Sequence, residues 1–173
     1  MAVPKKIIKY PSVAKGGDER MFIDFREKAG AKYEPIKHRT VYTAYDKAQT
    51  LHLAEKMVGK TLVLKIDKGI SVALIAANKN LDKNKLKKLA KAKKIDFVSE
   101  KIIKNKLKGV KVGAIPPFGN LWGLRTFIDK SLLKEPKIII SGGDYNWSIK
   151  ISPANFKKLI PDLITGSFSK AKK

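Results

Sequence analysis

The chain has 173 residues, no cysteine, an apolar share of 43% and a formal net charge of +23 at pH 7. The apolar share argues against a disordered chain, and the length fits one domain with a short appended end. The lack of cysteine excludes disulfides, thiolate metal sites and a cysteine nucleophile, as suits a protein of the reducing cytoplasm. The charge predicts an anionic partner such as a nucleic acid, although a lysine-rich organism would make every protein basic.

The beginning of the chain predicts an arm, a helix and a strand. Residues 1–18 contain prolines and glycines and have little periodicity, which indicates an extended arm. Asp18 is a suitable N-cap for a helix over 19–29, which Gly30 would end. Loose alternation over 33–38 then predicts a strand.

The next part predicts a helix and a hairpin. Thr43 can cap a helix whose apolar residues repeat at helical spacing until Gly59 closes it. Residues 61–66 and 70–77 have strong strand patterns, and 67–69 read Asp-Lys-Gly between them. This arrangement predicts a β-hairpin.

Three further helices and several strands complete the pattern. Asp82 and Ser99 are N-cap candidates, and Ser152 with Pro153 starts a final helix. The glycines and prolines of 113–119 exclude a helix or a central strand. Strand-like stretches cover 125–129, 137–140 and 147–151.

The order of elements predicts a single α+β domain with a mixed, mostly antiparallel sheet and surrounding helices, because the strands do not alternate regularly with helices. We assign 1–18 to the arm, 19–165 to the domain and 166–173 to a basic tail, and we expect the tail to be frayed from residue 169 onward.

Lys60 is the first candidate for a functional residue. Gly59-Lys60-Thr61 looks like the end of a phosphate-binding loop, but Ala54 occupies the position where that motif needs glycine, and Lys60 enters a strand. Its ammonium group could still hold a phosphate or a carbonyl oxygen. The alternative is a solvated surface lysine.

Two glycine-containing loops are the other candidates. In 113–119, prolines fix the backbone and glycines permit a ligand to come close, so the loop could hold a small polar group or orient a water molecule. In Ser141-Gly142-Gly143, backbone N–H groups could surround an anion. An ordinary structural turn is the alternative reading of each loop.

Several other kinds of site find no support. His38 and His52 are the only histidines and have no partners at metal-ligand spacing, so zinc is not expected. The chain has no Gly-x-Ser-x-Gly motif for a serine hydrolase, no secretory signal and no apolar run long enough for a membrane span. Trp122 and Trp147 could stack on a base, or could anchor the core.

A series of short motifs runs in order along about 33–161: His38 with Thr43, Lys60-Thr61-Leu62-Val63, Leu81 to Leu86, Val112 to Gly119, Ile128-Asp129, Ile140 to Gly143, and Ser152-Pro153-Ala154. In order and spacing these motifs resemble the YbaK and prolyl-tRNA-synthetase-associated domain family. Asp144-Tyr145-Asn146 departs from the basic residues that often follow the glycine pair in that family.

The resemblance implies a mixed sheet with surrounding helices and hydrolysis of the ester between an amino acid and the terminal adenosine of tRNA, without metal or cofactor. Lys60 would engage the terminal nucleotide, and the loop from Gly113 to Pro117 would hold the aminoacyl group and help to orient water, so Lys60, Gly113 and Pro117 are the implied catalytic residues. The implied substrate-binding residues are His38, Thr43, Thr61, Ala114, Ile115, Pro116, Phe118, Gly119, Ser141, Gly142 and Gly143.

We therefore expect a cytoplasmic trans-editing deacylase that acts on misacylated tRNA carrying a small amino acid. Cysteine, alanine, serine and threonine all remain compatible. A non-catalytic RNA-binding module on the same fold is one alternative, and an adaptor that recruits an aminoacyl-tRNA synthetase through 1–18 is another. No DNA or membrane partner is expected.

Overall fold

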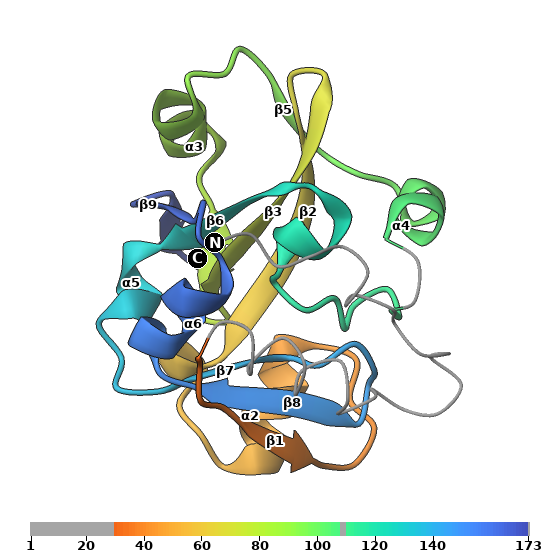
Figure 1. Ribbon diagram of the computed structural model, residues 1–173, viewed down its shortest axis with the longest axis vertical. Helices are drawn as coiled ribbons and strands as arrows, with labels where there is room; N and C mark the ends of the chain where they lie inside the picture. The colour runs from red at the N-terminus through yellow and green to blue at the C-terminus, as the bar shows by residue number, and fades with distance from the viewer. Residues whose placement is uncertain (1–29, 108–109, 173) are drawn as a thin grey trace.

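The computed structural model describes residues 30–107 and 110–172. The predicted arm over 1–18 and the predicted helix over 19–29 lie outside these residues. Within them, the strands form a five-stranded, a three-stranded and a two-stranded sheet, with helices packed around them (Figure 1). The α+β class predicted from the sequence is confirmed, with the strands shared among three sheets.

The five-stranded sheet is built on the predicted hairpin of β2 (Gly59–Ile66) and β3 (Gly69–Ala76), which pair antiparallel. Its order is β5-β2-β3-β6-β9, where β5 is Ile95–Phe97, β6 is Arg125–Asp129 and β9 is Ile164–Gly166. Strand β5 pairs antiparallel with β2, whereas β6 and β9 continue the sheet in parallel. β3 is therefore a central strand, which explains its continuous apolar run.

Alternate residues of β3 pack into two cores on opposite faces of this sheet. Leu74 packs in one core with Phe156 of helix α6 (Pro153–Leu159). Ile75 packs in the other with Leu86 of helix α3 (Lys83–Ala90). This is the period of two that strand geometry imposes.

The three-stranded sheet has the antiparallel order β1-β8-β7, where β1 is Glu34–Lys37, β8 is Trp147–Ile151 and β7 is Ile138–Ser141. A parallel bridge between Val58 and Ile139 connects this sheet to the start of β2. Figure 1 shows the three-stranded sheet at the lower end of the β2–β3 hairpin, with β5 toward its upper end. The site described below lies where these two sheets meet.

The predicted N-caps are confirmed for α3, α6, α2 (Ala44–Leu51) and α4 (Glu100–Lys106). In each case the cap's side-chain oxygen accepts a hydrogen bond from the backbone N–H three residues later, which satisfies an otherwise unpaired donor. A short helix α5 (Lys130–Leu133) was not predicted. The four predicted caps are Thr43, Asp82, Ser99 and Ser152.

The predicted end of α2 at Gly59 is wrong. The helix ends at Leu51, followed by His52 in a left-handed conformation and by a 3₁₀ turn over Glu55–Met57. Gly59 is instead the first residue of β2, where a Cβ would lie only 2.7 Å from Leu74 Cδ1. Close packing of the strand therefore requires glycine at this position.

The tail expected to fray is a strand over Ser169–Ala171, labelled β10, that pairs antiparallel with β4 (Lys79–Leu81). Phe168 anchors it, because this side chain is fully buried and packs edge-on against Phe127 with ring centroids 6.4 Å apart. Asp129 Oδ1 accepts a hydrogen bond from the Phe168 backbone N–H at 2.8 Å. The prediction of a frayed tail was wrong because it considered the lysines of this segment and overlooked Phe168.

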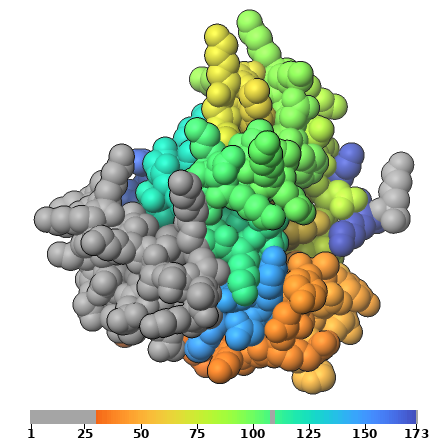
Figure 2. Space-filling model, turned by 90° about the vertical axis from the view of Figure 1, so that its right-hand side faces the viewer, coloured from red at the N-terminus to blue at the C-terminus, as the bar shows by residue number. Residues whose placement is uncertain are grey.

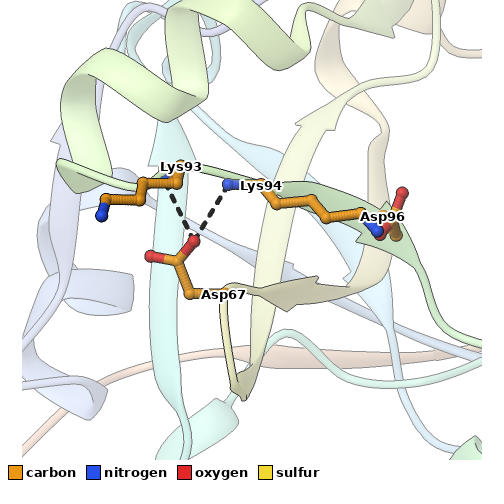
Figure 3. Close-up of polar contacts among 4 residues, drawn as sticks. All are labelled: Asp67, Lys93, Lys94 and Asp96. Atoms are coloured by element: carbon orange, nitrogen blue, oxygen red, sulfur yellow. Dashed lines mark hydrogen bonds and ion pairs between the residues drawn. The ribbon is translucent and has the colours of Figure 1, made fainter.

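Asp67 fixes the far end of the hairpin. It has the positive φ of 55° that a tight two-residue turn requires. Its Oδ1 accepts backbone hydrogen bonds from Lys93 and Lys94, both at 2.9 Å, and Lys94 Nζ lies 3.6 Å from Asp96 (Figure 3). The bond from the Lys94 N–H, followed by that from the Lys93 N–H, lowers the pKa of Asp67. Both bonds hold the turn against the segment that leads into β5.

Candidate functional site

A cavity of about 300 Å³ lies where the start of α2, the start of β2, the loop after α4 and the end of β7 come together. Its wall consists mainly of apolar side chains and backbone atoms, with a few charged and hydroxyl groups. Such a concave site with few convergent polar groups is typical of small-molecule binding. The lining residues are Val41, Tyr42, Thr43, Ala44, Lys47, Gly59, Lys60, Thr61, Leu62, Gly113, Ala114, Ser141, Asp144 and Tyr145.

Backbone hydrogen bonds hold three distant segments together around this cavity. Val41 N–H donates to the Tyr145 carbonyl at 2.9 Å, and Gly143 N–H donates to the Ala114 carbonyl at 2.9 Å. Tyr145 Oη donates to the Val112 carbonyl at 2.6 Å. Figure 2 shows these segments adjacent on one face, as orange, green-to-teal and blue surfaces.

Gly113 stands at the mouth of the cavity with a φ of 88°. This conformation strains any residue with a side chain, and a Cβ at this position would also lie 3.5 Å from the Tyr42 carbonyl oxygen. The glycine therefore lets the loop turn sharply beside the cavity. The suggestion from the sequence that this glycine permits close approach of a ligand stays a prediction.

Lys60 lies on β2 and is half-buried. Its Nζ donates to the Lys79 backbone carbonyl at 3.0 Å and forms no ion pair with any residue that the structure describes. Burial, with a smaller contribution from the nearby charge of Lys172, lowers the pKa of Lys60. A cation held without a counter-ion is available to an anionic ligand.

Lys47 is a second cavity lysine, and the sequence analysis missed it. Its side chain is 6% exposed, and its Nζ donates to Ser141 Oγ at 3.1 Å. Burial lowers its pKa to about 8. A sequence signal existed, because Lys47 lies at helical spacing from Ala44 and Leu51 and so belongs to the inward face of α2.

His38 does not line the cavity. Its Nε2 and Ser148 Oγ are hydrogen-bonded at 2.8 Å, and its Nδ1 lies 2.7 Å from the Arg39 carbonyl. Ser148 stands opposite Ser141 in the β7–β8 pair. Burial lowers the pKa of His38, and the charge of Lys47 adds to this effect.

Asp144 is the buried carboxylate of the cavity wall, and it was also missed as a site residue. Lys111 Nζ lies 2.8 Å from its Oδ1, which also accepts a bond from the Tyr145 N–H at 2.7 Å. The hydrogen bond to Asp144 raises the pKa of Lys111. In the sequence, residues 144–146 stood out only because they replace basic residues that are common in the family. That difference did not indicate that Asp144 and Tyr145 line the cavity.

Thr61 contributes an unsatisfied polar atom. Its Oγ1 is buried and has no hydrogen-bond partner among the residues described. Buried polar atoms are rarely left unpaired. Thr61 lines the cavity, but this oxygen is enclosed by the protein and does not face the open space.

The structure brings some of the predicted site residues to the cavity and leaves others away from it. Ile115 and Phe118 face the core, where Phe118 stacks near Phe156, and Gly119 N–H donates to Thr126 Oγ1. These residues follow the sharp turn inward, so they shape the loop instead of lining the cavity. Predicted residues that line it are Thr43, Lys60, Thr61, Gly113, Ala114 and Ser141; those that do not are His38, Ile115, Pro116, Pro117, Phe118, Gly119, Gly142 and Gly143.

A shallow groove of about 320 Å³ adjoins the cavity and shares Lys60 and Leu62 with it. Phe97 is 59% exposed in its wall, and Lys83 Nζ lies 5.4 Å from the centre of the Phe97 ring. Asn80 and Lys170, from the paired strands β4 and β10, also line the groove. An exposed aromatic ring among lysines is typical of a surface that binds single-stranded nucleic acid.

The described residues offer neither a metal-binding cluster nor a membrane-spanning helix. Over residues 30–107 and 110–172, no group of three or more His, Cys, Asp or Glu side chains could hold a metal ion. In the same residues, every helix is too short or too polar to cross a membrane.

The chain is similar to known proteins in its fold, and to a known family in its sequence. The fold is similar to a solved structure of the hypothetical protein APE2540, which covers 86% of this chain and 99% of its own at 21% identity, with a TM-score of 0.77. A proposed trans-editing enzyme for prolyl tRNA synthetase covers 84% of this chain and 92% of its own at 21% identity, with a TM-score of 0.71. No curated protein sequence matches the chain. The family model described as "aminoacyl-tRNA editing domain" matches residues 38–159, and the chain therefore belongs to that family, as its motifs suggested.

Proposed function

We propose that the protein is a trans-editing hydrolase that cleaves the ester of misacylated tRNA carrying a small amino acid. The observation that carries this proposal is the position of Lys60, which lines both the cavity and the basic groove beside it. An aminoacylated RNA end has a matching shape, with a small acyl group joined to a polyanionic strand. Lys60 stands where the two parts of such a ligand would meet.

The reaction requires water to attack the ester carbonyl and the ribose hydroxyl to leave. An aminoacyl ester is already activated, so orientation and stabilisation of the developing oxyanion can provide most of the catalysis. In this proposal Lys60 supplies positive charge near the junction of the acyl group and the RNA strand. Gly113 lets the backbone approach the acyl group. The ring of Pro117 restricts the backbone of the same loop.

The groove provides a place for the RNA strand next to the ester. Phe97 offers a ring on which a base can stack, and Lys83 and Lys170 offer charges for phosphate groups. Both interactions tolerate any base sequence, as suits the common 3′ end of tRNA. The surplus of 38 basic over 15 acidic residues would add salt-sensitive attraction to the tRNA body.

The volume of the cavity supports a small amino acid. About 300 Å³ must hold the acyl group and part of the ribose, and Tyr42 and Leu62 occupy space in the wall. We further propose that the protein acts in the cytoplasm, where aminoacyl-tRNA is made, and that a synthetase is a possible partner, in line with the similar structure of a proposed trans-editing enzyme.

The test is hydrolysis of a panel of aminoacylated tRNAs at low salt by the wild type, Lys60→Ala and the control Lys88→Ala. Lys88 is exposed on α3 and lines neither the cavity nor the groove. We expect selective release of a small amino acid and a loss of roughly a hundredfold or more in kcat for Lys60→Ala, as for removal of one oxyanion-stabilising group. Unchanged turnover in this variant would refute the role of Lys60.

The alternative function is a non-catalytic RNA-binding module. The basic groove with its exposed Phe97 favours this reading equally well, because it requires no chemistry in the cavity. Tight tRNA binding by the wild type without release from any aminoacyl-tRNA would support it against the hydrolase.

A further inference from the structure

Lys47 and Ser141 form a polar end within the otherwise largely apolar cavity. Both residues line the cavity, and both side chains are 6% exposed. Their hydrogen bond, 3.1 Å from Nζ to Oγ, joins helix α2 to the end of β7. Neither atom belongs to the groove that Lys60 shares with the cavity.

The ammonium group of Lys47 has no carboxylate partner in the described part of the chain. The buried carboxylate of the same cavity, Asp144, is held by Lys111 at 2.8 Å. His38, the neighbouring titratable group, is held by Ser148 and the Arg39 carbonyl. A buried cation is costly when it has no partner, so this arrangement favours a ligand that brings one.

Lys47 also retains hydrogen-bonding capacity. An ammonium group has three N–H donors, and the structure uses one of them, toward Ser141. The hydroxyl of Ser141 can rotate, so it can donate to a ligand as well as accept from Lys47. Together they offer donors and positive charge, which match an oxygen acceptor and do not match a methyl group.

We propose that Lys47 and Ser141 make this cavity selective, among short acyl groups, for those whose side chain ends in an oxygen acceptor: the carboxylate of an aspartyl group or the hydroxyl of a seryl or threonyl group. The inference rests on the proposed hydrolase function and narrows its substrate class. It places alanyl and cysteinyl groups, which the size of the cavity alone would admit, among the poor substrates.

The selectivity follows from what each acyl group leaves unpaired. An alanyl side chain would replace any water near Lys47 with a methyl group and would leave a buried ammonium without a new partner. A site built to hydrogen-bond a substrate oxygen rejects analogues that lack it. One hydrogen bond to a charged group corresponds to roughly a ten- to hundredfold difference in kcat/KM.

The experiment compares kcat/KM for aspartyl-, seryl- and alanyl-tRNA with the wild type, Lys47→Met and the control Lys88→Met. Methionine keeps the length and apolar stem of lysine without its charge or donors. We expect the wild type and Lys88→Met to prefer aspartyl and seryl over alanyl groups by at least tenfold, and Lys47→Met to lose this preference. Ser141→Ala provides a second variant, in which the preference should shrink.

The outcomes separate the two proposals. Hydrolysis of all three substrates with no preference, or a preference that Lys47→Met retains, would overturn the selectivity while leaving the hydrolase intact. If the wild type releases nothing, the hydrolase fails, and calorimetric binding of amide-linked seryl and alanyl adenosine analogues decides the selectivity. Tighter binding of the seryl analogue that depends on Lys47 would support it, and equal binding would refute it.

Discussion

Replacing Lys47 by methionine should make the protein more stable at neutral pH. Burial lowers the pKa of this lysine from 10.5 to about 8, which corresponds to roughly 3 kcal/mol of unfavourable free energy in the folded state at about 1.4 kcal/mol per pH unit. Methionine removes this cost and fills a similar volume, but it gives up the hydrogen bond to Ser141, worth about 1 kcal/mol. The expected net gain is therefore about 2 kcal/mol, or roughly 4–8 °C in Tm for a chain of this size.

The effect should depend on pH in a defined direction. Between about pH 8 and 10.5 the unfolded chain binds the Lys47 proton and the folded protein does not, so the stability of the wild type rises with pH across this window. The cost of burial is fully present below pH 8 and absent above pH 10.5. The advantage of Lys47→Met should therefore be greatest at pH 7 and disappear by about pH 10.5.

Urea unfolding of both proteins at pH 7, 8.5 and 10 measures this difference, and the comparison cancels the titration of the other lysines. Lys88→Met serves as the control for loss of one exposed positive charge. A less stable Lys47→Met protein at pH 7, or a difference between the two proteins that stays constant over this range, would refute the reasoning that the lysine is buried at a cost.

Two other substitutions test the groove and the C-terminal strand. Phe97→Ala should raise KM for aminoacyl-tRNA roughly 5- to 100-fold with a smaller change in kcat, because it removes a stacking surface that is 59% exposed. An unchanged KM in steady-state kinetics would show that no base stacks on this ring. Phe168→Ala should lower the free energy of unfolding by about 3–5 kcal/mol, because it removes a fully buried ring; a loss below about 1 kcal/mol in urea unfolding would mean that β10 is not anchored by it.

The fold class and most of the elements could be predicted from the sequence, because their signals are local. The N-caps at Thr43 and Asp82 and the turn at Asp67 depend on residues within a few positions of one another, and the structure confirms all three. The end of α2 and the strand β10 could not be found in this way. Gly59 belongs to β2, where it lies close to Leu74, and Phe168 packs on Phe127; both contacts join residues that are distant in sequence.

The candidate site was predictable only in part, for a related reason. Motifs indicated Lys60, Gly113 and Ser141, all of which line the cavity. They also drew in Phe118, because a motif does not tell which side chains of a loop face a cavity and which face the core. Lys47 was overlooked although its helical spacing places it inward, since a lysine at such a position is usually assigned to the surface.

The position of β10 in the chain has a consequence for folding during synthesis. One wall of the groove, including Lys170, is supplied by a segment that the ribosome makes after every other strand of the fold. A nascent chain can pair β2 with β3 and bury most of its apolar residues while this wall is still missing. In the proposed function, the groove would then be complete only after residues 169–171 pair with β4, so a nascent chain that has not yet formed this pair should bind tRNA weakly.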